Sequence, residues 1–280
     1  MKMDHPLRWL CKALAVSPSG YYDWLKRRAR PGPRARQEAQ LRQELVRLHQ
    51  ASRKTYGSPR LQAALAKVGC RHGRNRIARL MRLENLWGRQ RRRYRVRTTD
   101  SQHDHPIAPN RLAQLPPPST PNEIWVADIT YIPTQEGYLY LAGVMDLCSR
   151  RLVGWALGSS LEASLVIAAW DMAQTQRQPA PALILHSDRG CQYASTDFRQ
   201  ALAKTKSLPS MSRKACCYDN AAMESFWSTL KLELVYRTTF QTHSQARQAL
   251  FDFIEVFYNR QRLHSALNYR SPVDFENQNN

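Results

Sequence analysis

Residues 124–132 read IWVADITYI, a run of apolar and β-branched residues that a single carboxylate, Asp128, interrupts. Two further runs follow closely, GYLYLAGVMDLCS at residues 137–149 and RRLVGWALGSS at residues 150–160. Short runs of this composition, bounded by turn-prone or polar residues, are typical of β-strands. Three of them in succession predict an antiparallel meander, with Asp128 in its first strand.

The chain after the meander alternates between helical and extended patterns. We expect helices at residues 161–176, 197–204, 220–234 and 244–258, and short strands at residues 182–185 and 208–211. Leu250, Ile254 and Phe257 form the apolar stripe of the last helix. This alternation predicts an α/β domain over residues 124–280, with a mixed sheet that is flanked by helices on both faces.

Residues 1–97 predict a small all-α region instead. Helical patterns cover residues 7–16, 21–30, 36–51, 59–68 and 74–85, with turn signals between them. Ser58 can cap the fourth helix, Pro59 can occupy its first position, and Gly69 ends it. Two short helices joined by a glycine-containing turn, the second rich in arginine, form a helix-turn-helix pattern.

A proline-rich segment separates these two regions. Residues 98–123 hold six of the sixteen prolines of the chain and few apolar residues, which is typical of a linker. The run RQRRRYRVR at residues 89–97 leads into it. Such a run is either a solvated charged segment or a contact with nucleic acid.

The net charge of +20 is concentrated at one end of the chain. Residues 1–100 hold 26 basic and 6 acidic side chains, most of the basic ones arginine, whereas residues 101–280 hold 16 of each. An excess of this kind indicates a polyanionic partner, most simply nucleic acid, because neutralised phosphates release their counterions. The balanced remainder suggests a separate globular body.

Composition also excludes several classes of protein. No apolar stretch is long enough to span a bilayer, and charged residues interrupt the N-terminal segment, so we expect neither a membrane segment nor a secretion signal. The six cysteines show no zinc-binding spacing and are too sparse for a disulfide scaffold. These features favour a cytoplasmic protein, associated with the nucleoid if its partner is DNA.

Three carboxylates stand at unusual places. Asp128 lies within an apolar strand, where a carboxylate is costly unless it is paired or binds a metal. Asp188 ends the apolar run PALILHSD, at the edge where α/β sheets place ligands. Glu224 lies in an early turn of a helix, on the apolar side beside Met223 and Phe226. Each carboxylate has a structural alternative. Asp128 could form an ion pair, Asp188 could start a turn, and Glu224 could interact favourably with the helix dipole.

The spacing of these residues and the sequence motifs around them resemble those of a known family. Thirty-five residues separate Asp188 from Glu224, and the motifs include ILHSDRGCQYAS at residues 184–195, YDNAAMESFWSTLKLE at 218–233 and YNRQRLHSALNYRSP at 258–272. The N-terminal half contributes LCKALAVSPSGYYDWLKR at residues 10–27 and TYGSPRLQAAL at residues 55–65. The sequence resembles the D,D(35)E transposases of bacterial insertion sequences, which share the catalytic core of retroviral integrases and its ribonuclease H-like fold.

The resemblance implies a polynucleotidyl transferase that cuts and joins DNA with two Mg²⁺ or Mn²⁺ ions in each active site. It implies that Asp128 bridges both ions while Asp188 and Glu224 each bind one. It further implies that water frees a 3′-OH at the end of the element, and that this hydroxyl attacks another DNA phosphate. Two cations can stabilise both the attacking and the leaving oxygen of such a displacement. The expected DNA-binding residues are basic: Lys231, two helical turns after Glu224, and Arg74, Arg79, Arg82, Arg91, Arg92, Arg93 and Arg95.

The resemblance also concerns partners. It implies a multimer of this chain on DNA, bound to the ends of the element and to the target. The chain has no leucine-zipper heptad, which in these elements usually belongs to the product of an upstream reading frame joined by frameshifting. An upstream-frame protein is therefore an expected partner, and the chain acts either alone or as a fusion with it.

One departure keeps two other functions open. Ala215 and Cys216 stand where the family usually has Gly and then Asn or Asp, in the loop before Glu224. If that position needs a positive φ, alanine there is unfavourable and could displace the glutamate. A catalytically impaired DNA-binding regulator of transposition and a ribonuclease H-like nuclease are the alternatives to an active transposase.

Other conspicuous residues have structural explanations that are at least as good. They are His186 and Asp146, near the expected site, and Arg260, Arg262 and His264 in the C-terminal motif. None of them is assigned to the site.

Overall fold

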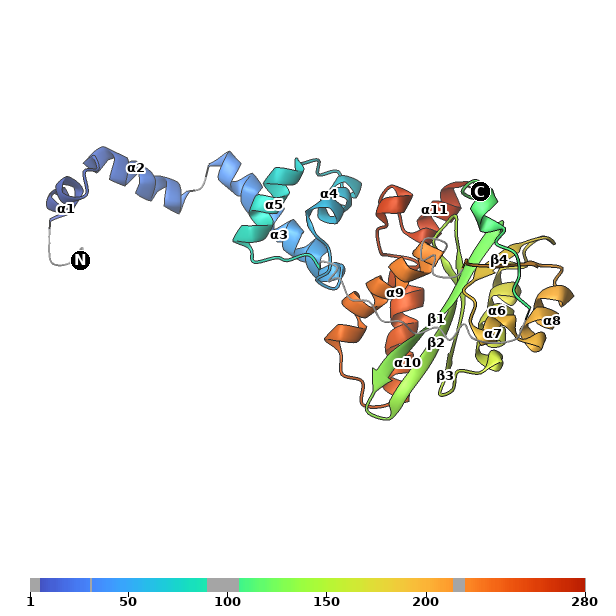
Figure 1. Ribbon diagram of the computed structural model, residues 1–280. Helices are drawn as coiled ribbons and strands as arrows, with labels where there is room; N and C mark the ends of the chain where they lie inside the picture. The colour runs from blue at the N-terminus through green and yellow to red at the C-terminus, as the bar shows by residue number, and fades with distance from the viewer. Residues whose placement is uncertain (1–5, 31, 90–105, 214–219, 280) are drawn as a thin grey trace. The chain divides into compact units, whose positions relative to one another are not determined.

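The computed structural model describes residues 6–30, 32–89, 106–213 and 220–279. The chain divides into two compact units, Met1–Gly88 and Arg89–Asn280, and Figure 1 shows the helices and strands of each. None of the helices within these ranges is long and apolar enough to cross a membrane. The domain boundary at residue 97 and the linker at residues 98–123 stay predictions.

The N-terminal unit consists of helices. Its elements are α1 (Leu7–Ala13), α2 (Pro18–Ala29), α3 (Pro33–Ala51), α4 (Ser58–Lys67) and α5 (Arg74–Leu83). Ser17 caps α2 by accepting a hydrogen bond from the backbone N–H of Gly20 at 3.0 Å. At α4 our expectation was wrong by one residue: Gly57 occupies the N-cap position, no side chain caps this helix, and Ser58 is its first residue.

Helices α3, α4 and α5 enclose a core of their own. Its fully buried members are Leu45 of α3, Leu61 and Leu65 of α4, and Ile77 and Leu80 of α5. Gly69 follows α4 with a φ of +82°, a backbone conformation that glycine adopts without strain. Because the apolar side chains of α5 face this core, its arginines remain on the outer surface.

The C-terminal unit is built on one mixed sheet. Its strands are β1 (Ile124–Thr134), β2 (Gly137–Asp146), β3 (Leu152–Gly158), β4 (Ile184–Ser187) and β5 (Leu208–Met211), in the order β3-β2-β1-β4-β5. Strands β1, β2 and β3 pair antiparallel, which confirms the meander. Strand β4 pairs parallel with both β1 and β5.

Helices cover both faces of this sheet, as Figure 1 shows. One face carries α6 (Ala163–Arg177), α7 (Cys191–Ala194) and α8 (Thr196–Lys204), and the other carries α9 (Ala221–Glu233), α10 (His243–Phe251) and η4 (Asp252–Tyr258). Along β1 the side chains alternate between them: Trp125 packs with the first group and Val126 with the second. The expected mixed sheet flanked by helices is confirmed.

Some elements differ from our expectation. The single helix expected at residues 244–258 is α10 followed by η4, which is a π-helix. Helix α7, helix α11 (Pro272–Asn279) and the short 3-10 turns η1 (Leu112–Gln114), η3 (Val235–Arg237) and η5 (Ser265–Leu267) were not expected. Elements of three or four residues are too short to show a period, and the sequence pattern does not distinguish a π-helical turn from an α-helical one.

The second half of the expected linker packs on the C-terminal unit. The backbone N–H of Arg111 donates to Ser210 Oγ at 2.9 Å, and its guanidinium donates to the Pro209 carbonyl at 3.3 Å. The backbone N–H of Asn122 donates to Asp146 at 2.6 Å. Within residues 106–123, Arg111 is therefore bonded to β5 and Asn122 to the end of β2.

Candidate functional site

Asp128 lies in the middle of the sheet, on β1, and is half-buried. Its Oδ1 accepts a hydrogen bond from the backbone N–H of Ile129 at 2.8 Å, and its Oδ2 accepts one from the indole N–H of Trp227 at 3.0 Å. Gly143 is its partner on β2, and a Cβ there would lie only 3.0 Å from the Trp227 ring. The glycine thus leaves room for the indole that holds the Asp128 carboxylate.

Asp188 follows the last residue of β4, directly beside β1. In the parallel pairing of these strands, Val126 is opposite His186. Asp128 and Asp188 each come two residues after this pair. Because side chains two residues apart on a strand point to the same face, we expect both carboxylates at the same height along the two neighbouring strands and on the same face of the sheet. Asp188 Oδ1 accepts a hydrogen bond from the backbone N–H of Gly190 at 2.9 Å, which orients this carboxylate within its turn.

Glu224 comes from the first turn of α9. Asn220, the N-cap residue of this helix, donates from Nδ2 to the carbonyl of Ala127 at 3.3 Å, and this bond holds the start of α9 against β1. Glu224 itself is exposed, which corrects our expectation that it lies on the apolar side. The buried neighbours are Met223 and Phe226, and successive residues on a helix are turned by about 100° from one another.

The three carboxylates interact electrostatically. Burial, the negative charge of Asp188 and, to a smaller extent, that of Glu224 together raise the pKa of Asp128 to about 7, against the hydrogen bonds from Ile129 and Trp227. The structure therefore places Asp188 and Glu224 where their charges act on Asp128. A cation at this place would relieve their repulsion.

The donor set fits a hard divalent cation. Carboxylate oxygens are the ligands that Mg²⁺ prefers, together with water and substrate phosphates. In the described ranges no three His, Cys, Asp or Glu side chains are already gathered in a metal-binding arrangement. The observation that fits a cation is the concentration of negative charge around the half-buried Asp128.

The raised pKa of Asp128 predicts a pH dependence of stability. An aspartate in the unfolded chain loses its proton near pH 4, whereas folded Asp128 keeps it up to a pH of about 7. The folded state binds more protons between these values, so the free energy of unfolding in metal-free buffer falls as the pH rises from about 4 to about 7.

Urea unfolding of wild type and Asp128→Asn at about pH 5 and about pH 8 measures this effect. We expect the fall in stability to be smaller in Asp128→Asn, because asparagine does not titrate. Comparing the two proteins cancels the contribution of Asp146, whose pKa is also raised by burial. An identical pH dependence of both proteins would contradict the assignment to Asp128.

Lys231 is located on the same side of α9 as Glu224, two turns later. Its ammonium lies 4.6 Å from the ring centroid of Tyr131 on β1. Burial lowers the pKa of Lys231, and the negative charge of Asp128 opposes that shift. Lys231 is thus half-buried and interacts with the charge of Asp128, so it is not an ordinary exposed lysine on a helix surface.

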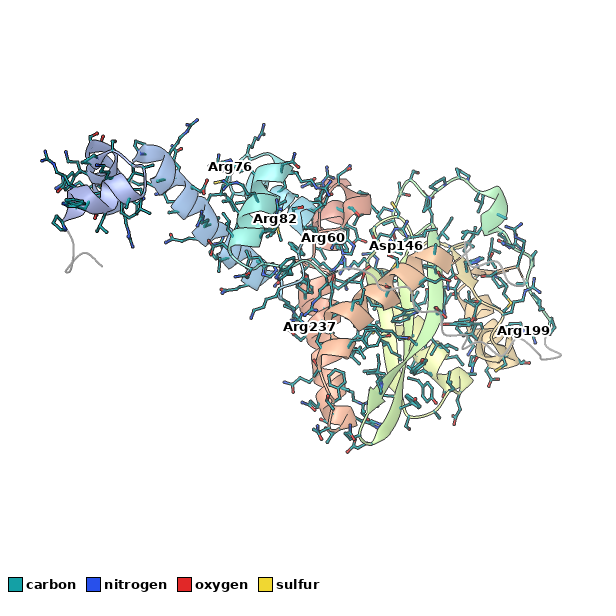
Figure 2. The ribbon with its side chains drawn as sticks, turned by 60° about the vertical axis from the view of Figure 1, so that its left-hand side comes forward. Arg60, Arg76, Arg82, Asp146, Arg199 and Arg237 are labelled. Carbon is teal, nitrogen blue, oxygen red and sulfur yellow. The ribbon has the colours of Figure 1, made fainter. Side chains whose placement is uncertain are left out.

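The arginines predicted to bind DNA have different surroundings. Arg74, Arg79 and Arg82 are exposed on α5, and Arg79 forms an ion pair with Glu38 of α3 at 2.7 Å. Arg76, which the sequence analysis did not select, is also exposed on α5, and Figure 2 marks it together with Arg82. The remaining four, Arg91, Arg92, Arg93 and Arg95, lie outside the described residues, as do Ala215 and Cys216.

Three residues near the carboxylates were not predicted from the sequence: Trp227, Asn220 and Tyr193. A signal existed for Trp227, which follows Glu224 by three residues and so lies near it on α9. A signal for Asn220 is its place just before the first apolar residues of a helix. Tyr193, buried on α7 five residues after Asp188, gave no signal.

Three of the other conspicuous residues, His186, Asp146 and Arg262, have structural roles. His186 is buried, with Nδ1 2.9 Å from Ser210 Oγ and Nε2 3.2 Å from Ser212 Oγ. Asp146 accepts hydrogen bonds from the backbone and side chain of Ser149, at 2.7 and 3.0 Å. Arg262 forms a buried ion pair with Glu233. These contacts explain why His186, Asp146 and Arg262 stand at these positions, and no catalytic role is needed to explain them.

Comparison with known families covers both units. Residues 118–217 and 224–279 match two family models, each described as an integrase core domain. Residues 35–94 match a model described as an HTH-like domain, which covers most of α3 and all of α4 and α5. The three models thus contain the predicted carboxylates and the predicted helix-turn-helix.

Curated relatives match almost the whole chain. It is 44% identical over 95% of its length to the insertion element IS600 uncharacterized 31 kDa protein of Shigella sonnei, of which 97% is covered. It is 40% identical over 80% of its length to the transposase for insertion sequence element IS904 of Lactococcus lactis, of which 88% is covered. It is 36% identical over 99% of its length to transposase InsF for insertion sequence IS3A of Escherichia coli, of which 96% is covered.

Proposed function

Because the chain belongs to the transposases of insertion sequences that carry an integrase core domain, its function is DNA transposition, and we propose that Asp128, Asp188 and Glu224 bind its catalytic cations. Integrase core domains depend on divalent metal. The observation that supports the assignment is the register of β1 and β4, in which Val126 is opposite His186, so that Asp128 and Asp188 each follow this pair by two residues. The proposed occupants are two Mg²⁺ or Mn²⁺ ions.

Each residue of the site has a distinct part in this proposal. The bound cations would supply Lewis acidity toward the DNA phosphate and its attacking and leaving oxygens. Asp128, held by Trp227, is the central ligand, and Asp188 is oriented by its hydrogen bond from Gly190. Glu224 completes the set from the first turn of α9, where its side chain is exposed. Lys231 contacts DNA phosphate beside the carboxylates.

The N-terminal unit binds DNA in this proposal. Arg74, Arg76 and Arg82 lie exposed on the second helix of the helix-turn-helix, the element that enters the major groove in such motifs. The basic run at residues 89–97 is proposed to add phosphate contacts. The chain is proposed to act as a multimer on the nucleoid in the cytoplasm, with an upstream-frame protein as an additional partner.

Replacing Arg74 by Gln is expected to weaken binding to the ends of the element, since a charged contact with DNA is lost. The slope of log K against log salt concentration should become less steep by about 0.9 for each phosphate contact removed. Fluorescence anisotropy at several salt concentrations measures it. Arg79→Gln should reduce the slope less, because Arg79 is paired with Glu38.

The exposed Arg247 of α10 serves as a matched control, because Arg247→Gln removes the same charge from the other unit. It should leave affinity and slope unchanged. Equal slopes of log K against log salt concentration for wild type and Arg74→Gln would show that Arg74 does not contact DNA.

A joining assay tests the proposed reaction. DNA carrying the inverted repeats that flank the reading frame is incubated with the full chain and Mg²⁺, and also with a chelator. We expect cleavage at the repeat ends followed by joined products, both dependent on the metal. Cleavage without joining would identify a nuclease, and binding without either reaction would identify a regulator.

A further inference from the structure

Tyr193 has a buried hydroxyl that the fold leaves without a hydrogen bond. Its side chain is only 3% exposed, and within the described part of the chain its Oη has no partner. Burying a polar group without a partner is unfavourable by about 1–3 kcal/mol, and most buried hydroxyls in proteins do have one. This hydroxyl therefore calls for a partner that the described residues do not supply.

A short chain of hydrogen bonds connects Tyr193 with Asp188. The backbone N–H of Tyr193 donates to the carbonyl of Gly190 at 3.0 Å, and the N–H of Gly190 donates to Asp188 Oδ1 at 2.9 Å. Both residues thus belong to the single turn that follows β4. The position of the tyrosine and the position of the carboxylate are coupled through Gly190.

Packing fixes the direction of the tyrosine ring. It meets the ring of Phe198 on α8 edge to face, with centroids 5.4 Å apart and an interplanar angle of 78°. Both rings are part of the core between the sheet and α6, α7 and α8. A ring held in this way cannot turn its hydroxyl to solvent.

The surroundings of the hydroxyl are negatively charged. Burial raises the pKa of Tyr193 well above its ordinary value, and the charges of Asp128 and Asp188 raise it further. The phenol therefore keeps its proton and serves as a hydrogen-bond donor near both carboxylates. A buried donor that senses the charge of both carboxylates is suited to binding an oxygen atom among those that surround a cation.

We propose that Tyr193 is a positioning residue of the cation site, whose O–H donates a hydrogen bond to an oxygen ligand of the ion that Asp128 and Asp188 hold. This inference rests on the proposed function. The oxygen is one of the two carboxylates or a water molecule bound with the cation. Groups that hold metal ligands in place in this manner typically contribute 10- to 100-fold to metal affinity.

Tyr193→Phe tests the proposal, because it removes the hydroxyl and retains the ring that packs on Phe198. Titration of the full chain with Mn²⁺, with free Mn²⁺ read from its electron paramagnetic resonance signal, should give an affinity about ten-fold lower than in wild type. Urea unfolding in metal-free buffer should show equal or higher stability, because an unpartnered buried hydroxyl is lost. If the hydroxyl had only a structural role, Tyr193→Phe would keep the Mn²⁺ affinity of wild type and would be less stable in metal-free buffer.

Tyr258→Phe is the matched control. Tyr258 is equally buried, but it packs on the opposite side of the sheet against Phe226 and His264. Its replacement should leave Mn²⁺ affinity unchanged. Wild-type Mn²⁺ affinity in Tyr193→Phe, or a loss of its metal-free stability, would overturn the inference and leave the proposed function intact. Wild-type protein that binds no Mn²⁺ would overturn both.

Discussion

Asp188→Asn is expected to reduce the rates of DNA cleavage and of joining by about a thousand-fold or more. A catalytic cation stabilises the transition state by several kcal/mol, and about 4 kcal/mol corresponds to a factor of about 10³ in rate. Asparagine has the size of aspartate but lacks the charge that attracts the ion. Its side-chain oxygen can still accept the hydrogen bond from Gly190, so the turn should keep its shape.

The measurement is the formation of cut and joined products over time, in Mg²⁺ and in Mn²⁺, with wild type and variant at equal concentration. Asp197→Asn is the control, because it removes an exposed carboxylate nine residues away, in the first turn of α8. Circular dichroism and binding to the ends of the element should be the same for all three proteins. Equal rates for wild type and Asp188→Asn would remove Asp188 from the site.

Replacing Glu233 by Leu is expected to lower the free energy of unfolding of the C-terminal unit by about 3–5 kcal/mol. Glu233 ends α9 and accepts two hydrogen bonds from the Arg262 guanidinium, at 2.9 and 2.7 Å. Both side chains are about 5% exposed. Removal of one partner leaves the other as a buried, uncompensated charge, which explains the size of the expected loss.

Urea unfolding followed by tryptophan fluorescence measures this loss. The double variant Glu233→Leu with Arg262→Met removes both charges together, and we expect it to recover most of the stability. A double variant no more stable than Glu233→Leu would show that the unpaired charge is not the cause. Because α9 also carries Glu224, Trp227 and Lys231, the single variant should lose catalytic activity at temperatures where the unit unfolds.

The paired carboxylates illustrate how far sequence reasoning reached. The apolar run around Asp128 predicts a strand, and the run before Asp188 predicts a buried strand that ends at this residue. Both strands exist as β1 and β4, although β4 begins two residues later than expected. The spacing to Glu224 and the family resemblance selected the third member. All three residues were thus identified from local patterns and from motifs in a fixed order.

The errors have local causes as well. A capping preference does not determine which residue takes the N-cap position, and Gly57 takes it where Ser58 was expected. The apolar stripe of Leu250, Ile254 and Phe257 is compatible with an α-helix throughout, yet the segment becomes π-helical at Asp252. These differences alter the backbone by one residue in a turn, which hydrophobic periodicity does not register.

The sequence by itself determined the order of the strands and of the longer helices and the charge division of the chain, and it selected the three carboxylates of the proposed site, because each of these depends on short-range patterns and motifs. Only the tertiary structure decided which groups hold them. The hydrogen bond from Trp227 to Asp128 joins residues 99 positions apart, and the bond from Asn220 to Ala127 joins residues 93 apart. The pairing of Arg79 with Glu38 and the unpartnered hydroxyl of Tyr193 depend in the same way on packing between distant segments. Hydrogen bonding and burial depend on distance in space, and periodicity along a chain does not encode that distance.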